Sequence, residues 1–135
     1  MSEPREIDKL AWLTYSNRRV LGVRSKGKAL HYLPGGKREP GETDREALLR
    51  EVREELSVEL DGEALKPVGV FVGLADGKSD GTRVRLTCYE APYRGRLEAA
   101  AEIEALDWFG LGDAPRCSEA MRLVLERLQE LGRID

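Results

Sequence analysis

The stretch GGKREPGETDREALLREVREELSV, residues 35–58, decides the fold of this chain and poses an electrostatic question. Its first part is rich in glycine and proline, which predicts a loop. Its second part predicts a helix over residues 43–56, because Thr43 and Glu46 form a capping-box pattern. Apolar residues recur at the helical period on one side of this helix, namely Leu48, Leu49, Val52 and Leu56. The stretch therefore predicts a loop that leads into an amphipathic helix.

Three glutamates, Glu51, Glu54 and Glu55, gather beside the apolar stripe of the predicted helix. On a helical wheel they lie within an arc of about 100°. Like charges at this spacing repel each other, and only Arg50 and Arg53 are near enough to offset them. A hard divalent cation would relieve the repulsion, and a set of oxygen ligands favours Mg²⁺ or Mn²⁺. For such a cluster taken alone, an ordinary solvated helix face is the alternative interpretation.

The size and composition of the chain predict one soluble globular domain over residues 1–135. Apolar residues make up 41% of the chain and charged residues 35%. The formal net charge of −3 gives no general attraction to DNA or to membranes, so we expect neither as a partner. The amino terminus has no apolar segment typical of a secretory signal, and no apolar run is long enough to span a bilayer. We therefore expect a cytoplasmic location.

The remaining chain alternates strand and helix patterns. Strands are predicted at residues 7–15, 19–25, 29–33, 67–75, 82–90 and 104–109. A second helix is predicted at residues 118–131, where apolar residues again follow the helical period. The order of strands, helix, strands, helix predicts an α/β fold in which a mixed sheet lies between two helices.

The spacing around the three glutamates resembles the signature of the Nudix (MutT-like) hydrolases, G-x5-E-x7-R-E-U-x-E-E-x-G-U, where U is aliphatic. Six fixed positions of this signature match, namely Gly36, Glu42, Arg50, Glu51, Glu54 and Glu55. At a usage of roughly 7% per residue type, six such matches arise by chance about once in ten million placements. Ser57 stands where the family has a glycine, which affects the end of the helix but removes no ligand.

The resemblance implies a Nudix-type α/β/α sandwich and a diphosphate-cleaving enzyme that uses Mg²⁺ or Mn²⁺. Glu51, Glu54 and Glu55 would be catalytic metal ligands, with Glu51 also a candidate base, and the carbonyl of Gly35 would complete the shell. Arg50 would hold the carboxylate of Glu51 in place.

The resemblance also assigns residues outside the glutamate cluster. Gly36 and Glu42 would have structural roles in the motif. Some family members use a further glutamate shortly before a tryptophan near the last strand, and Glu102 fits that place. Glu98 and Glu104 are rivals for the same role.

Binding of a polyphosphate also requires basic side chains outside the motif. Arg24, Lys26 and Lys28 are candidates that flank a strand end and a turn, and Lys37 and Arg38 are candidates on the loop that leads into the predicted helix. Arg83, Arg85 and Tyr89 share one face of a predicted strand, where the arginines could contact phosphate and the tyrosine could stack on a base. Solvated surface side chains are the alternative for each.

The resemblance favours a Mg²⁺-dependent pyrophosphohydrolase that acts on a nucleoside triphosphate or a related nucleoside diphosphate derivative. One alternative is hydrolysis of another diphosphate, such as a dinucleoside polyphosphate or an RNA 5′ end. Another is a non-catalytic nucleotide sensor. The sequence leaves a homodimer open, because no surface is singled out as an interface.

Overall fold

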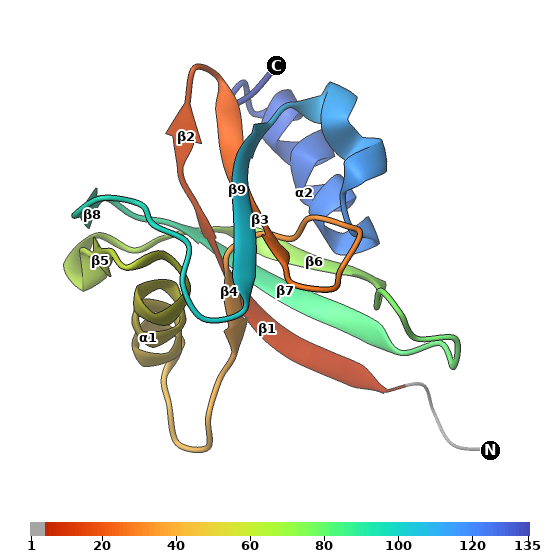
Figure 1. The fold of residues 1–135 in the computed structure, drawn as a ribbon, viewed down its shortest axis with the longest axis horizontal. Helices are drawn as coiled ribbons and strands as arrows, with labels where there is room; N and C mark the ends of the chain where they lie inside the picture. Colours follow the sequence, from red (N-terminus) through yellow and green to blue (C-terminus); the bar gives the residue numbers. More distant parts are fainter. Residues whose placement is uncertain (1–4) are drawn as a thin grey trace.

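The computed structural model describes residues 5–135, which form two main sheets, a small two-stranded sheet and two main helices that flank the strands (Figure 1). The two main helices are α1 (Asp44–Leu56) and α2 (Glu119–Glu130). The strands are β1 (Glu6–Leu13), β2 (Tyr15–Ser16), β3 (Arg19–Ser25), β4 (Gly35–Lys37), β5 (Glu59–Leu60), β6 (Lys66–Leu74), β7 (Arg83–Glu90), β8 (Tyr93–Arg94) and β9 (Ile103–Phe109). Two short 3₁₀ turns complete the chain, η1 (Gly62–Ala64) and η2 (Leu111–Arg116).

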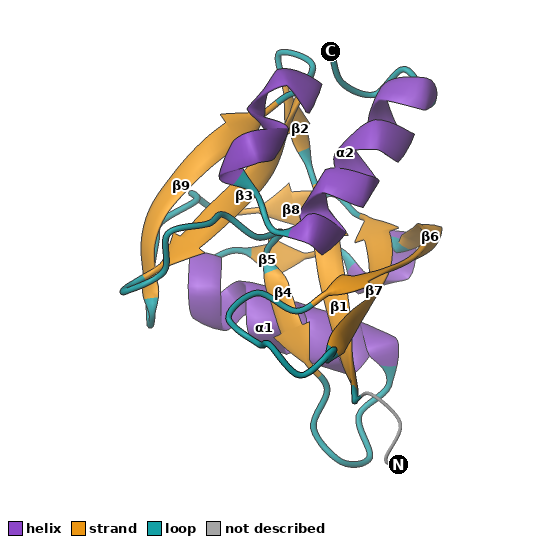
Figure 2. Ribbon diagram, turned by 90° about the vertical axis from the view of Figure 1, so that its right-hand side faces the viewer, coloured by secondary structure: helices purple, strands orange, loops and turns teal. Residues whose placement is uncertain are grey.

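The larger sheet is mixed and has the strand order β4-β1-β7-β6. Its central pair, β1 and β7, is parallel, whereas β4 and β6 run antiparallel to their neighbours. The smaller sheet has the order β2-β3-β9 and is antiparallel. Helices α1 and α2 lie on opposite sides of the strands (Figures 1 and 2). The predicted α/β/α sandwich with a mixed sheet is therefore confirmed.

Two hydrophobic cores hold the helices to the strands. The core under α1 joins Leu48, Val52 and Leu56 of the helix to the fully buried Trp12 of β1. The core under α2 contains Phe109 of β9 and the apolar stripe of that helix, which consists of Met121, Val124, Leu125 and Leu128. Each helix thus buries the stripe that its sequence period predicts.

Helix α1 begins and ends as its sequence predicts. The hydroxyl of Thr43 accepts a hydrogen bond from the backbone N–H of Glu46, and the Glu46 carboxylate accepts one from the N–H of Thr43. At the other end, Ser57 adopts the left-handed conformation with φ of 64°. Serine therefore takes the backbone shape that glycine would adopt more easily at this position.

Replacing Thr43 by alanine is expected to lower the free energy of unfolding by about 1 kcal/mol, because one helix N–H loses its acceptor. Urea denaturation monitored by circular dichroism measures this change. Thr87→Ala, which alters a strand residue on β7 and touches no helix cap, serves as the control for threonine removal as such. An unchanged unfolding midpoint for Thr43→Ala would show that the cap contributes nothing.

The predicted strand at residues 29–33 is wrong. His31 and Tyr32 form only isolated bridges, with Cys117 and Val23 respectively, and the strand β4 starts after Pro34. β4 exists because Gly35 and Gly36 pair with β1, a partner far away in the sequence. Glycine has a low intrinsic preference for strands, so this pairing overrides the local signal. Within residues 5–135, neither α1 nor α2 is long and apolar enough to cross a membrane.

Candidate active site

A cavity of about 460 Å³ lies beside α1 and is lined by acidic, basic and apolar side chains. Its carboxylates are Glu51, Glu55, Asp76 and Glu102. Its basic residues are Lys9, Lys28, Lys37 and Lys78. The apolar lining includes Ile7, Leu10, Leu33, Val84 and Leu86. The volume suits a small-molecule ligand, and the mixture of charges suits a ligand that carries phosphate and binds with a cation.

Glu55 is the most buried carboxylate of the cavity, with only 7% of the residue exposed. The backbone N–H of Gly35 donates a hydrogen bond of 3.0 Å to Glu55 Oε1. Burial, together with the nearby charges of Glu51 and Glu102, raises the pKa of Glu55 to about 8, although the Gly35 hydrogen bond opposes the shift. A buried carboxylate beside two others is a costly arrangement unless a cation compensates it.

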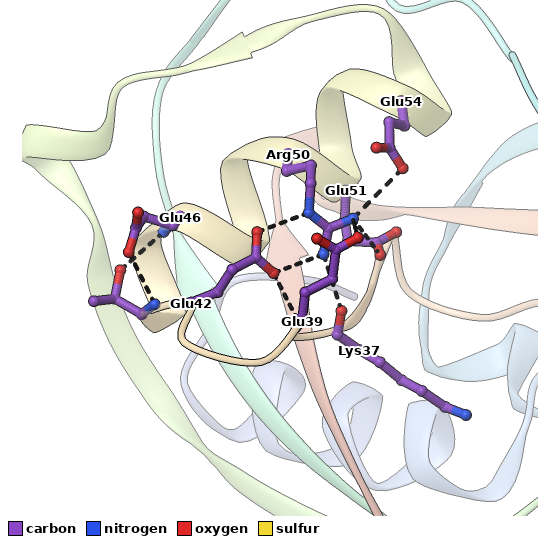
Figure 3. A network of polar contacts seen from close by, with 8 residues as sticks. Lys37, Glu39, Glu42, Glu46, Arg50, Glu51 and Glu54 are labelled. Carbon is purple, nitrogen blue, oxygen red and sulfur yellow. Dashed lines mark hydrogen bonds and ion pairs between the residues drawn. The ribbon is translucent and has the colours of Figure 1, made fainter.

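Glu51 lies beside Glu55 in the cavity, with 18% of its side chain exposed. Burial raises the pKa of Glu51, whereas the hydrogen bond from Arg50 opposes this shift. Arg50 Nη1 donates to Glu51 Oε1 at 3.0 Å (Figure 3). A Cβ atom on Gly36 would lie 2.6 Å from the Glu51 carboxyl carbon, so glycine is needed there to leave space for the carboxylate.

Arg50 also binds Glu42 through two parallel hydrogen bonds (Figure 3). Its Nε and Nη2 atoms donate to the two carboxylate oxygens of Glu42, each at 2.8 Å. Glu42 in turn accepts a hydrogen bond of 2.7 Å from the N–H of Glu39. The Arg50 guanidinium lowers the pKa of Glu42 to about 2. Glu42 thus ties the loop to the helix through Arg50, and Arg50 orients Glu51.

Replacing Arg50 by lysine is expected to lower kcat at least about tenfold, because lysine cannot form the paired bonds to Glu42 and also hold Glu51. The expected change lies in kcat rather than in KM, since Arg50 acts through Glu51. Arg53→Lys is the matched control: Arg53 lies on the same helix and pairs only with the exposed Glu59. Steady-state kinetics that show equal kcat for both variants would contradict this role for Arg50.

Glu54 does not belong to the residues that line the cavity, unlike Glu51 and Glu55. Its side chain is 55% exposed, and its carboxylate lies 3.6 Å from Arg50 Nη1 (Figure 3). Among residues 5–135, no group of three His, Cys, Asp or Glu side chains is close enough to hold a metal ion as arranged here. Glu51 and Glu55 line the cavity and Glu54 does not, but the carboxylates of Glu51 and Glu54 both lie beside Arg50 Nη1, so metal binding by Glu54 stays a prediction.

The oxygen donors that line the cavity nevertheless fit a hard divalent cation. Glu51 and Glu55 are buried carboxylates whose raised pKa values reflect desolvation and mutual repulsion, which a cation would relieve. Glu102 lines the same cavity, whereas Glu104 pairs with Arg24 and the exposed Glu98 lies near Arg96. Of the three candidates for the additional glutamate, the structure brings only Glu102 to the site.

Gly35 donates its backbone N–H to a carboxylate of the site and also lines the cavity. The metal-binding role that the sequence resemblance predicts for its carbonyl stays a prediction. The structure instead shows the Gly35 N–H bonded to Glu55, with φ of 141°, a conformation that L side chains rarely adopt. Gly35 thus holds the buried carboxylate in place.

Among the predicted phosphate-binding residues, the structure brings Lys28 and Lys37 to the cavity. Arg24 bonds to Glu104 at 2.9 Å and to the carbonyl of Lys28. Arg38 forms ion pairs with Asp8 and Asp44. Both arginines are held by these contacts, and neither lines the cavity.

Arg83, Arg85 and Tyr89 lie on the face of β7 opposite to the cavity. The alternation along the strand directs Val84 and Leu86 to the cavity and the three predicted residues away from it. The hydroxyl of Tyr89 donates to Asp44 Oδ2 at 2.6 Å, and its ring packs in the core under α1. The prediction that these residues contact phosphate and base is therefore corrected by the geometry.

Other cavity residues were missed by the sequence analysis, namely Lys9, Asp76 and Lys78. Tyr32 lines the cavity as well, and its hydroxyl donates to Asp76 Oδ2. Only Lys9 left a signal in the sequence, because Ile7, Lys9 and Ala11 alternate along β1 and place one charge on an otherwise apolar face. The others come from loops whose approach to the site the sequence does not encode locally.

Comparisons with known proteins agree with this fold. A curated relative, CTP pyrophosphohydrolase from Escherichia coli K12, is 39% identical over 87 residues, which are 64% of this chain and 59% of that relative. The matched region thus spans less than two thirds of the relative's length.

Solved structures also match along most of their length. The Escherichia coli ORF135 protein is 26% identical with a TM-score of 0.73, and the match covers 96% of this chain and 92% of the other. A MutT NUDIX hydrolase from Burkholderia pseudomallei is 25% identical with a TM-score of 0.77, covering 92% and 98%. The NUDIX domain family matches residues 4–128. With Gly36, Glu51 and Glu55 of the signature at one cavity and the family matched over nearly the whole sequence, the chain belongs to the Nudix domain family.

Proposed function

We propose that the protein is a divalent-metal-dependent pyrophosphohydrolase that cleaves the diphosphate linkage of a nucleoside triphosphate or a related nucleoside diphosphate derivative. The observation that supports this most directly is the cavity, where Glu51, Glu55 and Glu102 share one lining with four lysines. Such a site can hold a cation and a polyphosphate side by side. The matching family and the CTP pyrophosphohydrolase relative support the same class of reaction.

Glu51, Glu55 and Glu102 are the residues that would hold the metal, with Mg²⁺ or Mn²⁺ as the ion. Glu54 can join them by a side-chain rotation, because it is exposed and would give up only its 3.6 Å pair with Arg50. A bound divalent ion would neutralise phosphate charge and lower the pKa of a water molecule.

Glu51 is the proposed proton acceptor for the attacking water. Its pKa is raised by burial, which makes the carboxylate a better base near neutral pH. One of its oxygens, Oε1, is held by Arg50, so the carboxylate keeps a defined orientation while Oε2 remains to accept a proton. The buried Glu55, held by the Gly35 N–H, is assigned to metal binding instead.

The test is hydrolysis of a nucleotide panel in ¹⁸O-labelled water, with CTP, the other nucleoside triphosphates and nucleotide sugars as substrates. We expect Mg²⁺-dependent release of pyrophosphate or phosphate, with the label on one product only. Activity should vanish with a chelator and return on adding Mg²⁺. A folded, metal-loaded protein that binds nucleotides tightly without turning any over would overturn the proposal in favour of a nucleotide sensor.

A further inference from the structure

Lys9 and Lys37 face each other directly across two paired strands. They are register partners in the antiparallel pair β1–β4, and both line the cavity. Directly opposed residues in such a pair have Cβ atoms about 5 Å apart, and like charges in these positions are destabilising. The fold therefore places the two lysines side by side at the site.

The structure does not compensate this repulsion by ion pairs. Among residues 5–135, none of the four cavity lysines has a carboxylate within 4.0 Å, whereas arginines elsewhere on the chain form many such pairs. Lys9 lies over the ring of Tyr32, with its Nζ atom 5.9 Å from the ring centroid. Burial lowers the pKa of Lys9 and the charge of Lys37 lowers it further; Glu55 opposes this shift, and Lys28 and Glu51 have smaller effects of opposite sign.

An anionic ligand explains why the two lysines are kept together. Two unpaired cations on a cavity wall reduce the stability of the free protein and become favourable once an anion lies between them. The lysine ammonium is a compact charge with freely rotating donors, which can follow a phosphate group more readily than an arginine already fixed by a carboxylate. The neighbouring glutamates exclude an anion that comes without a cation.

We propose that Lys9 and Lys37 together bind the terminal phosphate of the substrate's polyphosphate chain. This inference rests on the proposed function and narrows its substrate class. A terminal phosphate carries close to two negative charges near neutral pH, because its second pKa is about 6, whereas a phosphate within a bridge carries one. The lysine pair therefore favours a nucleoside triphosphate with a free end over a diphosphate capped by a sugar.

The test compares Lys9→Gln, Lys37→Gln and the double variant with Lys66→Gln, which removes an exposed lysine from the start of β6, away from the cavity. Lys9→Arg tests whether a positive charge at this position is sufficient. Thermal unfolding of the free proteins is measured first. Binding of the tripolyphosphate ion in the presence of Mg²⁺ is then measured by isothermal titration calorimetry, with phosphate release followed in the same samples.

We expect Lys9→Gln to bind tripolyphosphate about tenfold more weakly or worse, because one charged contact is lost. The same substitution should raise the melting temperature of the free protein, since it removes the repulsion. The double variant should gain less stability than the sum of the two single variants. If Lys9 had a purely structural role, Lys9→Gln would instead have a lower melting temperature and an unchanged affinity for tripolyphosphate. Lys66→Gln should change neither quantity, and Lys9→Arg should restore binding.

Steady-state kinetics separate this inference from the proposed function. If nucleotides are hydrolysed, the preference in kcat/KM for nucleoside triphosphates over nucleotide sugars should fall in Lys9→Gln and Lys37→Gln. If tripolyphosphate binding depends on both lysines but no nucleotide is hydrolysed, phosphate binding by the lysine pair is supported and the proposed function is overturned. Equal tripolyphosphate affinity in Lys9→Gln and the unsubstituted protein would overturn the lysine pair, whatever the activity.

Discussion

Replacing Glu55 by glutamine is expected to lower kcat by about 1000-fold, the largest effect on activity expected for any single residue of this chain. Loss of a metal ligand removes about 4 kcal/mol of stabilisation from the transition state, and each 1.4 kcal/mol corresponds to a factor of ten in rate. Glu55 is the most buried of the cavity glutamates and is held in place by the Gly35 N–H. Burial and this hydrogen bond therefore fix the position of its carboxylate.

The same substitution should leave the fold intact. Glutamine keeps the size of the side chain and still accepts the hydrogen bond from Gly35, while it avoids placing a charge in a buried position. Steady-state kinetics and titration with Mn²⁺, which reports metal affinity directly, are the measurements. Glu98→Gln is the matched control, because Glu98 was a rival for a role in metal binding and lies outside the cavity. Full activity of Glu55→Gln would remove Glu55 from the metal site.

Replacing Gly35 by alanine is expected to lower the free energy of unfolding by about 3 kcal/mol or more. A Cβ atom there would lie 2.0 Å from the carbonyl oxygen of Leu10, a backbone atom that cannot move without disrupting β1. The φ of 141° at this position adds strain for any L side chain. Because Gly35 and Gly36 form the pairing of β4 with β1, the damage should extend to the cavity.

Gly36→Ala provides an informative contrast to this substitution. Its Cβ would meet the Glu51 carboxylate at 2.6 Å, and a side chain can rotate away where a backbone cannot. We expect a smaller loss of stability than for Gly35→Ala, together with a large fall in kcat as Glu51 is displaced. Gly112→Ala, with open space around its Cβ, is the control for both. Denaturant unfolding that gives Gly35→Ala and Gly112→Ala the same free energy of unfolding would contradict the steric argument.

Local chemistry accounts for the parts of this protein that were predictable. The capping box, the apolar period of α1 and the cluster of glutamates all lie within one continuous segment, so their geometry follows from the helix itself. The same holds for α2 and for the long strands β1, β6 and β7, whose alternation or apolar period spans many residues. The family signature could be read because its spacing is contained in that single segment.

The lining of the cavity depended on contacts between segments far apart in the chain. β4 contains two glycines and forms because β1 offers it a partner, and that pairing brings Lys9 opposite Lys37. Alternation along β7 placed Arg83 and Arg85 together on one face, yet the packing of α1 determined that this face is turned away from the cavity. Glu102 reaches the site and Glu104 does not, although only Ile103 lies between them. A helix carries its side-chain geometry within itself, whereas the position of a strand or loop is set by whatever packs against it.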